Sequence, residues 1–188
     1  MNNVVSLRKE QSSTHTIATA AAALVRNGYA PVPIKPGTKR PDLLSWSKIE
    51  IDERTVEDWK STGRGGHGVG LRCDLTPGID LDISDESVLG DLLDWCDAAL
   101  GVTCRRTGRP PRVLLPYRCD APFPKISSAK YESPDGNTHQ IEILGKGNQF
   151  VAFAIHPDTN KPYAWEGGDP LRIPAVDLPT LTPEMGGH

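Results

Sequence analysis

The sequence predicts a mixed α/β fold of the α+β kind, whose later half is largely antiparallel. Three observations predict it: an Ala-rich helical segment near the N-terminus, several aliphatic runs of strand length, and one longer amphipathic helix between two of these runs. The 188 residues are enough to bury a sizeable core. We expect one catalytic domain over residues 1–168, followed by a Pro-rich tail or linker over 169–188 that shows little periodicity.

The N-terminal half begins with a predicted helix over Thr14–Asn27. Alanine has the highest helix propensity, and Gly28 is a typical C-terminal stop. Tyr29–Ile34 has the pattern of a short strand, and its two prolines cannot donate hydrogen bonds to a ladder, so it is expected at a sheet edge. A short helix is expected over Thr55–Trp59, and a glycine-dense connector then leads into Val69–Arg72.

The second half begins with a predicted buried strand over Ile79–Ile83. Ser84 or Asp85 then caps a helix that ends at Gly101. Three more strands are expected, at Arg112–Tyr117, His139–Leu144 and Gln149–Ala154. Glycine supplies positive φ, so Gly145–Asn148 is expected to be the hairpin turn between the last two strands.

Composition excludes several classes of protein. No run approaches the ~20 apolar residues of a membrane span, and the first eleven residues lack the apolar core of a secretory signal, so we expect a cytoplasmic protein. The four cysteines show no CxxC spacing, which argues against a zinc ribbon and favours reduced thiols. No serine-hydrolase elbow, Walker loop or GxGxxG motif is present. The formal charge of −3 neither indicates nor excludes nucleic-acid binding, because clustering of charge matters more than its total.

Three acids in aliphatic strands are the candidate catalytic residues. Asp80 and Asp82 alternate with Ile79, Leu81 and Ile83, so both carboxylates face one side of their strand. Glu142 stands between two isoleucines in the same manner. Paired hard oxygen ligands suit Mg²⁺ or Mn²⁺, and three carboxylates on paired strands would suit two such ions. The alternative is that these acids lie on solvated faces of edge strands.

Basic side chains supply the complement to these acids. Arginine presents a planar fork that matches phosphate oxygens, and loop lysines can also approach an anion. His156 ends an apolar strand at a position from which its side chain can reach over a site. The candidates for phosphate binding are Arg105, Arg106, Arg109 and Arg112 in RRTGRPPR, Lys35, Lys39 and Arg40 in an earlier loop, Lys146 in the glycine turn, and His156. For any one of them, the alternative is an ordinary solvated charge.

Four segments taken in order resemble a known family. They are GYAPVPIKPGTKRP, GVGLRCDLTPGIDLDI, RTGRPPRVLLPYR and QIEILGKGNQFVAFAIHPDTNKPYAW. Together they are similar to the N-terminal domain of bifunctional DNA primase/polymerases, the prim-pol branch of the archaeo-eukaryotic primase superfamily found in phages and plasmids. The resemblance runs from about Thr14 to Trp165.

This resemblance implies a two-lobed fold whose catalytic half is an RRM-like sheet. The family's first motif, acid-x-acid, falls on Asp80 and Asp82, and its third motif falls on Glu142; these acids would hold two Mg²⁺ or Mn²⁺ ions. The middle motif usually carries a histidine that contacts the phosphates of the nucleotide. Here Arg112, or Arg109, stands near that position. His156 falls in a segment that resembles the family's HPdTg pattern.

The resemblance also implies function and partners. It implies DNA primase and polymerase activity on a DNA template or primer with nucleoside triphosphates, in the cytoplasm of a bacterial host. Lys146, Lys39 and Arg40 would assist at the phosphates of nucleotide or template. A helicase domain or another replisome protein is the expected partner, the absent helicase region suggests a fragment of a longer replicase, and no membrane is involved. A metal-dependent nuclease and a non-catalytic nucleic-acid-binding replication module remain alternatives, since similar acids cleave phosphodiesters and a binder can keep the fold.

Overall fold

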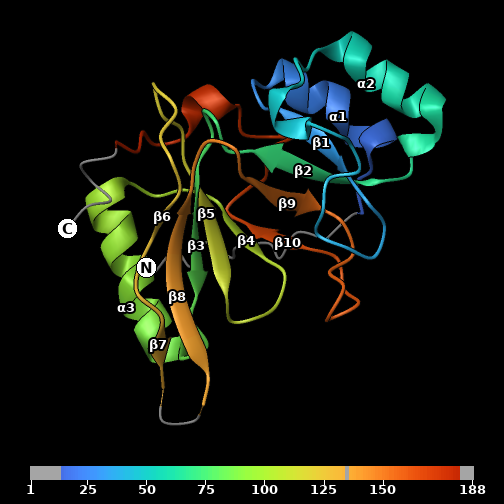
Figure 1. Cartoon of the computed structure of the whole chain (residues 1–188). Helices are drawn as coiled ribbons and strands as arrows, with labels where there is room; N and C mark the ends of the chain where they lie inside the picture. Colours follow the sequence, from blue (N-terminus) through green and yellow to red (C-terminus); the bar gives the residue numbers. More distant parts are fainter. Residues whose placement is uncertain (1–13, 134–135, 183–188) are drawn as a thin grey trace, which may run out of the picture.

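The computed structural model describes residues 14–133 and 136–182 and contains two β-sheets, one of three strands and one of seven. The named strands pair antiparallel throughout. The two sheets form two lobes, with helices outside each (Figure 1). This arrangement confirms the predicted α+β class. Within the described ranges, no helix combines the length and the apolar character needed to cross a bilayer.

The small lobe is built on the three-stranded sheet. Its elements are α1 (Ile17–Arg26), β1 (Pro31–Ile34), η1 (Trp46–Lys48), α2 (Glu53–Trp59), η2 (Lys60–Arg64), β2 (Gly68–Arg72) and β9 (Gln149–Phe153). The strand order β1-β2-β9 leaves β1 at an edge, as its prolines predicted. Helix α2 begins where Asp52 accepts a hydrogen bond of 2.7 Å from the Thr55 backbone N–H, which satisfies one of the free donors of its first turn.

The large lobe is built on the seven-stranded sheet. Its elements are β3 (Gly78–Asp82), α3 (Glu86–Leu100), β4 (Arg105–Thr107), β5 (Val113–Pro116), β6 (Ile126–Ser127), β7 (Tyr131–Glu132), β8 (Thr138–Leu144), β10 (Ala164–Glu166) and the turn η3 (Ala175–Asp177). The strands run in the order β10-β4-β5-β3-β8-β6, and β7 also pairs with β8. Strands β4, β6 and β7 were not predicted, because segments of two or three residues are too short to carry a periodic signal.

The two faces of the large sheet have different neighbours. Ile79 and Leu81 point into a core that also contains Leu89 of α3, so α3 covers that face. Asp80 points to the opposite face. On that face Leu114, its cross-strand partner on β5, belongs to the core shared with the small lobe. The polar positions of β3 therefore look toward the small lobe.

The connection from β8 to β9 differs from the predicted hairpin. Strand β8 pairs with β3 in the large sheet, whereas β9 pairs with β2 in the small one. The turn over Gly145–Asn148 therefore carries the chain from one lobe to the other. Gly147 has φ of +80° there, so the expected glycine conformation is present although the strands are not partners.

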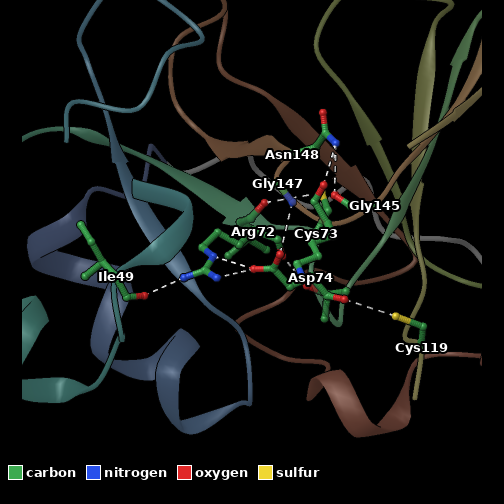
Figure 2. Close-up of polar contacts among 11 residues, drawn as sticks. Ile49, Arg72, Cys73, Asp74, Cys119, Gly145, Gly147 and Asn148 are labelled. Carbon is green, nitrogen blue, oxygen red and sulfur yellow. Dashed lines mark hydrogen bonds and ion pairs between the residues drawn. The ribbon is translucent and has the colours of Figure 1, made fainter. Parts of the chain in front are cut away.

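A partly buried polar network fixes this crossing (Figure 2). The Arg72 guanidinium contacts the Asp74 carboxylate and donates a hydrogen bond of 2.7 Å to the Ile49 carbonyl oxygen. The other carboxylate oxygen of Asp74 accepts from the Gly147 backbone N–H at 3.3 Å. The Asp74 carbonyl accepts from the Cys119 thiol at 3.5 Å. We call these contacts the Arg72 junction, because they join β2, the interlobe turn and the segment after β5.

The segment after residue 168 lies closer to the core than its composition suggested. Ala175 and Leu178 belong to the core beneath α1, and Leu181 belongs to the core beneath α3. The Leu181 backbone N–H also donates to the Arg118 carbonyl oxygen at 2.8 Å. Prolines prevent a periodic pattern here, yet isolated apolar side chains between them still fill gaps in the core. Residues 183–188 of the expected tail, and residues 1–11, lie outside the described part, and a domain boundary after residue 168 stays a prediction.

Candidate active site

A cleft of about 210 Å³ lies on the face of the large sheet that is turned away from α3. Strands β3, β4, β5, β8 and β9 contribute to its lining. Seven of the candidate residues line it: Lys39, Asp80, Asp82, Arg106, Arg109, Arg112 and His156. The polar lining residues that the sequence did not indicate are Gln149, Asp158 and Tyr163.

The acids come from two neighbouring strands. Strands β3 and β8 pair so that Asp80 lies directly opposite Glu142, and Asp82 lies opposite Gln140. Directly opposite residues in an antiparallel pair share a face, so Asp80, Asp82 and Glu142 all project from the same side of the sheet.

Two of these three carboxylates are turned toward cations of the chain itself. Arg112 Nε lies 2.7 Å from Asp82 Oδ1. Lys125 Nζ lies 2.6 Å from Glu142 Oε1, and the Ser127 hydroxyl lies 3.3 Å from the same oxygen. Glu142 does not line the cleft. Among residues 14–133 and 136–182, no three acidic, histidine or cysteine side chains converge as a ready metal cluster.

The environment of Asp80 differs from that of Asp82 and Glu142. No hydrogen bond or ion pair joins its carboxylate to another residue in the described part of the chain. Burial raises the pKa of Asp80, and the neighbouring charges of Asp82 and Glu142 raise it further, whereas Arg106 and Lys39 act in the opposite direction. A buried carboxylate of this kind favours an additional cation beside it.

Arg106 is the buried cation of the cleft. Its side chain comes from β4, and only 9% of the residue is exposed. The guanidinium carbon lies 4.8 Å from the centre of the Tyr163 ring and 5.9 Å from that of Phe150. Burial lowers the pKa of Arg106, and Asp80 counteracts this. Among the described residues, no acceptor forms a hydrogen bond with Arg106 Nε. An arginine with an unused donor beside a cleft is suited to an anionic ligand.

His156 closes one side of the cleft. Its Nδ1 accepts hydrogen bonds from the backbone N–H groups of Asp158 and Thr159 at 3.2 and 3.4 Å. Burial lowers the pKa of His156, as do the cations around it, so the neutral ring with its proton on Nε2 is favoured. The backbone of Gly108 packs against this region so closely that an added Cβ would collide with Tyr163 and His156. The glycine of the arginine loop is therefore needed for close packing.

Four candidates for phosphate binding lie elsewhere: Lys35, Arg40, Arg105 and Lys146 do not line the cleft. Arg105 Nη2 lies 2.7 Å from Asp97 Oδ2. Arg40 lies in the loop after β1, where its carbonyl accepts from the Lys35 N–H at 2.9 Å. Lys146 lies in the interlobe turn, and its backbone N–H donates to the Phe123 carbonyl at 2.7 Å.

The donor set of the acids fits a divalent cation in its chemistry. Mg²⁺ and Mn²⁺ prefer carboxylate oxygens, and the raised pKa of Asp80, which Arg106 and Lys39 offset only in part, marks a place where a cation would be stabilised. Asp82 shares the face of Asp80, and Glu142 lies across from it. In binding the same ions, Asp82 and Glu142 would share their negative charge with Arg112 and Lys125, each of which contacts one oxygen of its carboxylate.

A comparison with protein families gives one match. The model for the N-terminal domain of bifunctional DNA primase/polymerases, Prim-Pol, matches residues 20–181. This range includes every lining residue of the cleft and both lobes. No curated protein matches the chain.

Proposed function

The chain belongs to the family of bifunctional DNA primase/polymerase N-terminal domains, and we propose that it catalyses template-directed nucleotidyl transfer. In this reaction the 3′-oxygen of a primer or initiating nucleotide bonds to the α-phosphorus of a nucleoside triphosphate, and pyrophosphate leaves. The observation that carries the proposal is the cleft, in which a strand with two aspartates meets four cationic side chains: Lys39, Arg106, Arg109 and Arg112. We place the reaction in phage or plasmid replication, with DNA as template and a helicase or other replisome protein as partner.

The triphosphate is proposed to bind between the arginine loop and His156. Arg109 and Arg112 offer planar donors to phosphate oxygens, and Arg112 takes the place of the family's usual histidine. The Nε2 proton of neutral His156 adds one more donor, because Nδ1 is already used as an acceptor. Lys39 contributes a point charge at the opening, and Arg40, outside the cleft, is assigned to the template backbone.

Asp80, Asp82 and Glu142 are proposed to hold two Mg²⁺ or Mn²⁺ ions. When bound, such ions lower the pKa of an attacking hydroxyl and neutralise charge that develops on the triphosphate. The chain's own contribution is to hold the three carboxylates on one face of two paired strands. Arg106 supplies a fixed positive charge near Asp80, which stabilises the ionised carboxylate in the absence of metal.

A primer–template extension assay with labelled dNTPs and Mn²⁺ tests this function. We expect the labelled strand to grow, and growth to stop in EDTA. Shortening of the strand would instead indicate a metal-dependent nuclease. DNA binding that is unchanged in EDTA, without any strand growth in Mn²⁺, would indicate a non-catalytic binding module, whose affinity should fall steeply with salt.

A further inference from the structure

Asp82 and Glu142, the two acids next to Asp80, each form an ion pair with a basic side chain, and these two basic side chains differ in position. Arg112, which pairs with Asp82, lines the cleft, where an anionic ligand can draw its guanidinium away. Lys125, which pairs with Glu142, does not line the cleft. An anionic ligand in the cleft therefore does not draw Lys125 away from Glu142, as it can draw Arg112 away from Asp82.

The strand register places Lys125 at Glu142. Strand β6 is at the edge of the large sheet and pairs Ser127 with Glu142. Lys125 precedes Ser127 by two residues, so both side chains extend to the same side and flank the glutamate. The Nζ–Oε1 distance of 2.6 Å and the Ser127 contact at 3.3 Å involve the same carboxylate oxygen.

The backbone of Lys125 has little freedom to leave this position. Phe123, two residues earlier, is buried in the α3 core, and its carbonyl oxygen accepts from the Lys146 N–H at 2.7 Å. This carbonyl lies so close to Gly145 that an added Cβ there would collide with it. The lysine side chain is still 37% exposed, so it can swing into solvent while its backbone stays in place.

We propose that Lys125 competes with divalent cations for Glu142 and so limits the metal affinity of the site. This inference rests on the proposed function, in which Glu142 is a metal ligand. Glu142 lies between Asp80 on β3 and Lys125 beside β6, so its carboxylate has one acidic and one basic neighbour. Lys125 contacts only Oε1 of Glu142, so a divalent cation that binds this carboxylate competes with the ammonium group for its negative charge and binds against its repulsion. Lys125 thereby also neutralises Glu142 when no metal is bound.

The test is a Mn²⁺ titration of the full chain without nucleotide, in which electron paramagnetic resonance measures free Mn²⁺ at fixed ionic strength. We expect Lys125→Met to bind Mn²⁺ about three- to tenfold more tightly, since a partly exposed pair and its repulsion are removed. Lys125→Arg keeps the charge and should bind close to the wild-type affinity. The matched control is Lys130→Met, at an exposed lysine near the same edge that forms no ion pair with the described residues.

Two further variants separate this inference from the proposed function. Glu142→Gln should weaken Mn²⁺ binding, and Lys125→Met/Glu142→Gln should bind no more tightly than Glu142→Gln alone. If Glu142→Gln weakens binding but Lys125→Met leaves it unchanged, or if Lys130→Met strengthens it equally, only the Lys125 inference is overturned. If Glu142→Gln has no effect on Mn²⁺ affinity, the assignment of Glu142 as a ligand fails and the Lys125 inference fails with it. Circular dichroism in EDTA checks that each variant is folded.

Discussion

Two arginine–aspartate neighbours of this molecule, Arg72 with Asp74 and Arg106 with Asp80, have different surroundings. At the Arg72 junction the guanidinium and the Asp74 carboxylate both find partners in β2, the interlobe turn and the loop before α2 (Figure 2). In the cleft, Arg106 keeps an Nε without an acceptor, and Asp80 has no hydrogen bond within the described part of the chain. Groups with complete partners stabilise a fold, whereas buried groups with unused capacity favour a ligand.

The two regions also differ in how the charge of their arginine is stabilised. Burial of Arg106 is offset by two aromatic rings, by a side-chain hydrogen bond with Tyr163 and by the charge of Asp80, whereas Arg72 forms a direct ion pair with Asp74. We therefore expect substitutions in the cleft to reduce activity and substitutions at the Arg72 junction to reduce stability.

The largest expected effect is that of Asp80→Asn on activity. The amide keeps the shape of the side chain and removes the negative charge, so primer extension should fall at least about 10²- to 10³-fold. Thermal unfolding in EDTA should occur at the same or a higher temperature, because a buried carboxylate with a raised pKa is replaced by a neutral group. Extension at the wild-type rate would remove Asp80 from the proposed site.

Asp74→Ala tests the other region. It leaves Arg72, whose side chain is only 15% exposed, without its carboxylate. We expect the free energy of unfolding to fall by about 2–4 kcal/mol, as measured by urea unfolding, with extension per folded molecule nearly unchanged. The control is Asp120→Ala, which breaks the ion pair between Arg118 and Asp120. Because the Asp120 side chain is 82% exposed, this change should lower the free energy of unfolding by at most about 0.5 kcal/mol. Equal losses in both variants would contradict the distinction between the regions.

Arg112→Lys sharpens the comparison within the cleft. A lysine keeps the charge but cannot donate two parallel hydrogen bonds to a phosphate, so the KM for nucleotide should rise about tenfold. The unfolding temperature should change little, since Asp82, the partner of Arg112, is 43% exposed. Steady-state extension kinetics at varied dNTP concentration measure this, and an unchanged KM would exclude Arg112 as a phosphate contact.

The smallest expected effect is a pH dependence of stability. The pKa of Asp80 is raised in the folded state above its ordinary value of 3.8, so the folded chain binds this proton more tightly than the unfolded chain. In EDTA, the contribution of Asp80 to stability is therefore present at low pH and lost as the pH rises through the raised pKa. The stability of Asp80→Asn relative to the wild type should thus increase from pH 4.5 to pH 7.5 in urea unfolding. A difference that stays constant with pH would contradict the raised pKa.

Local sequence patterns predicted much of the fold and part of the site. Alternation along β3 placed Asp80 and Asp82 on one face, and alanine content, capping residues and glycine predicted α1 and α3. These features depend on neighbours within a few residues, which the sequence states directly.

Other features depended on which strands became neighbours. The turn at Gly145–Asn148 has the composition of a hairpin, but β8 pairs with β3 and β9 pairs with β2, so the two strands enter different sheets. Arg106 comes from a strand too short to predict, and its aromatic partners Phe150 and Tyr163 lie more than forty residues later in the chain. Sequence alone thus determined which residue types were available on each strand. The pairing of distant strands, driven by burial of their apolar faces, decided that Lys125 pairs with Glu142, while the Asp80 carboxylate has no hydrogen bond or ion pair with any of residues 14–133 and 136–182.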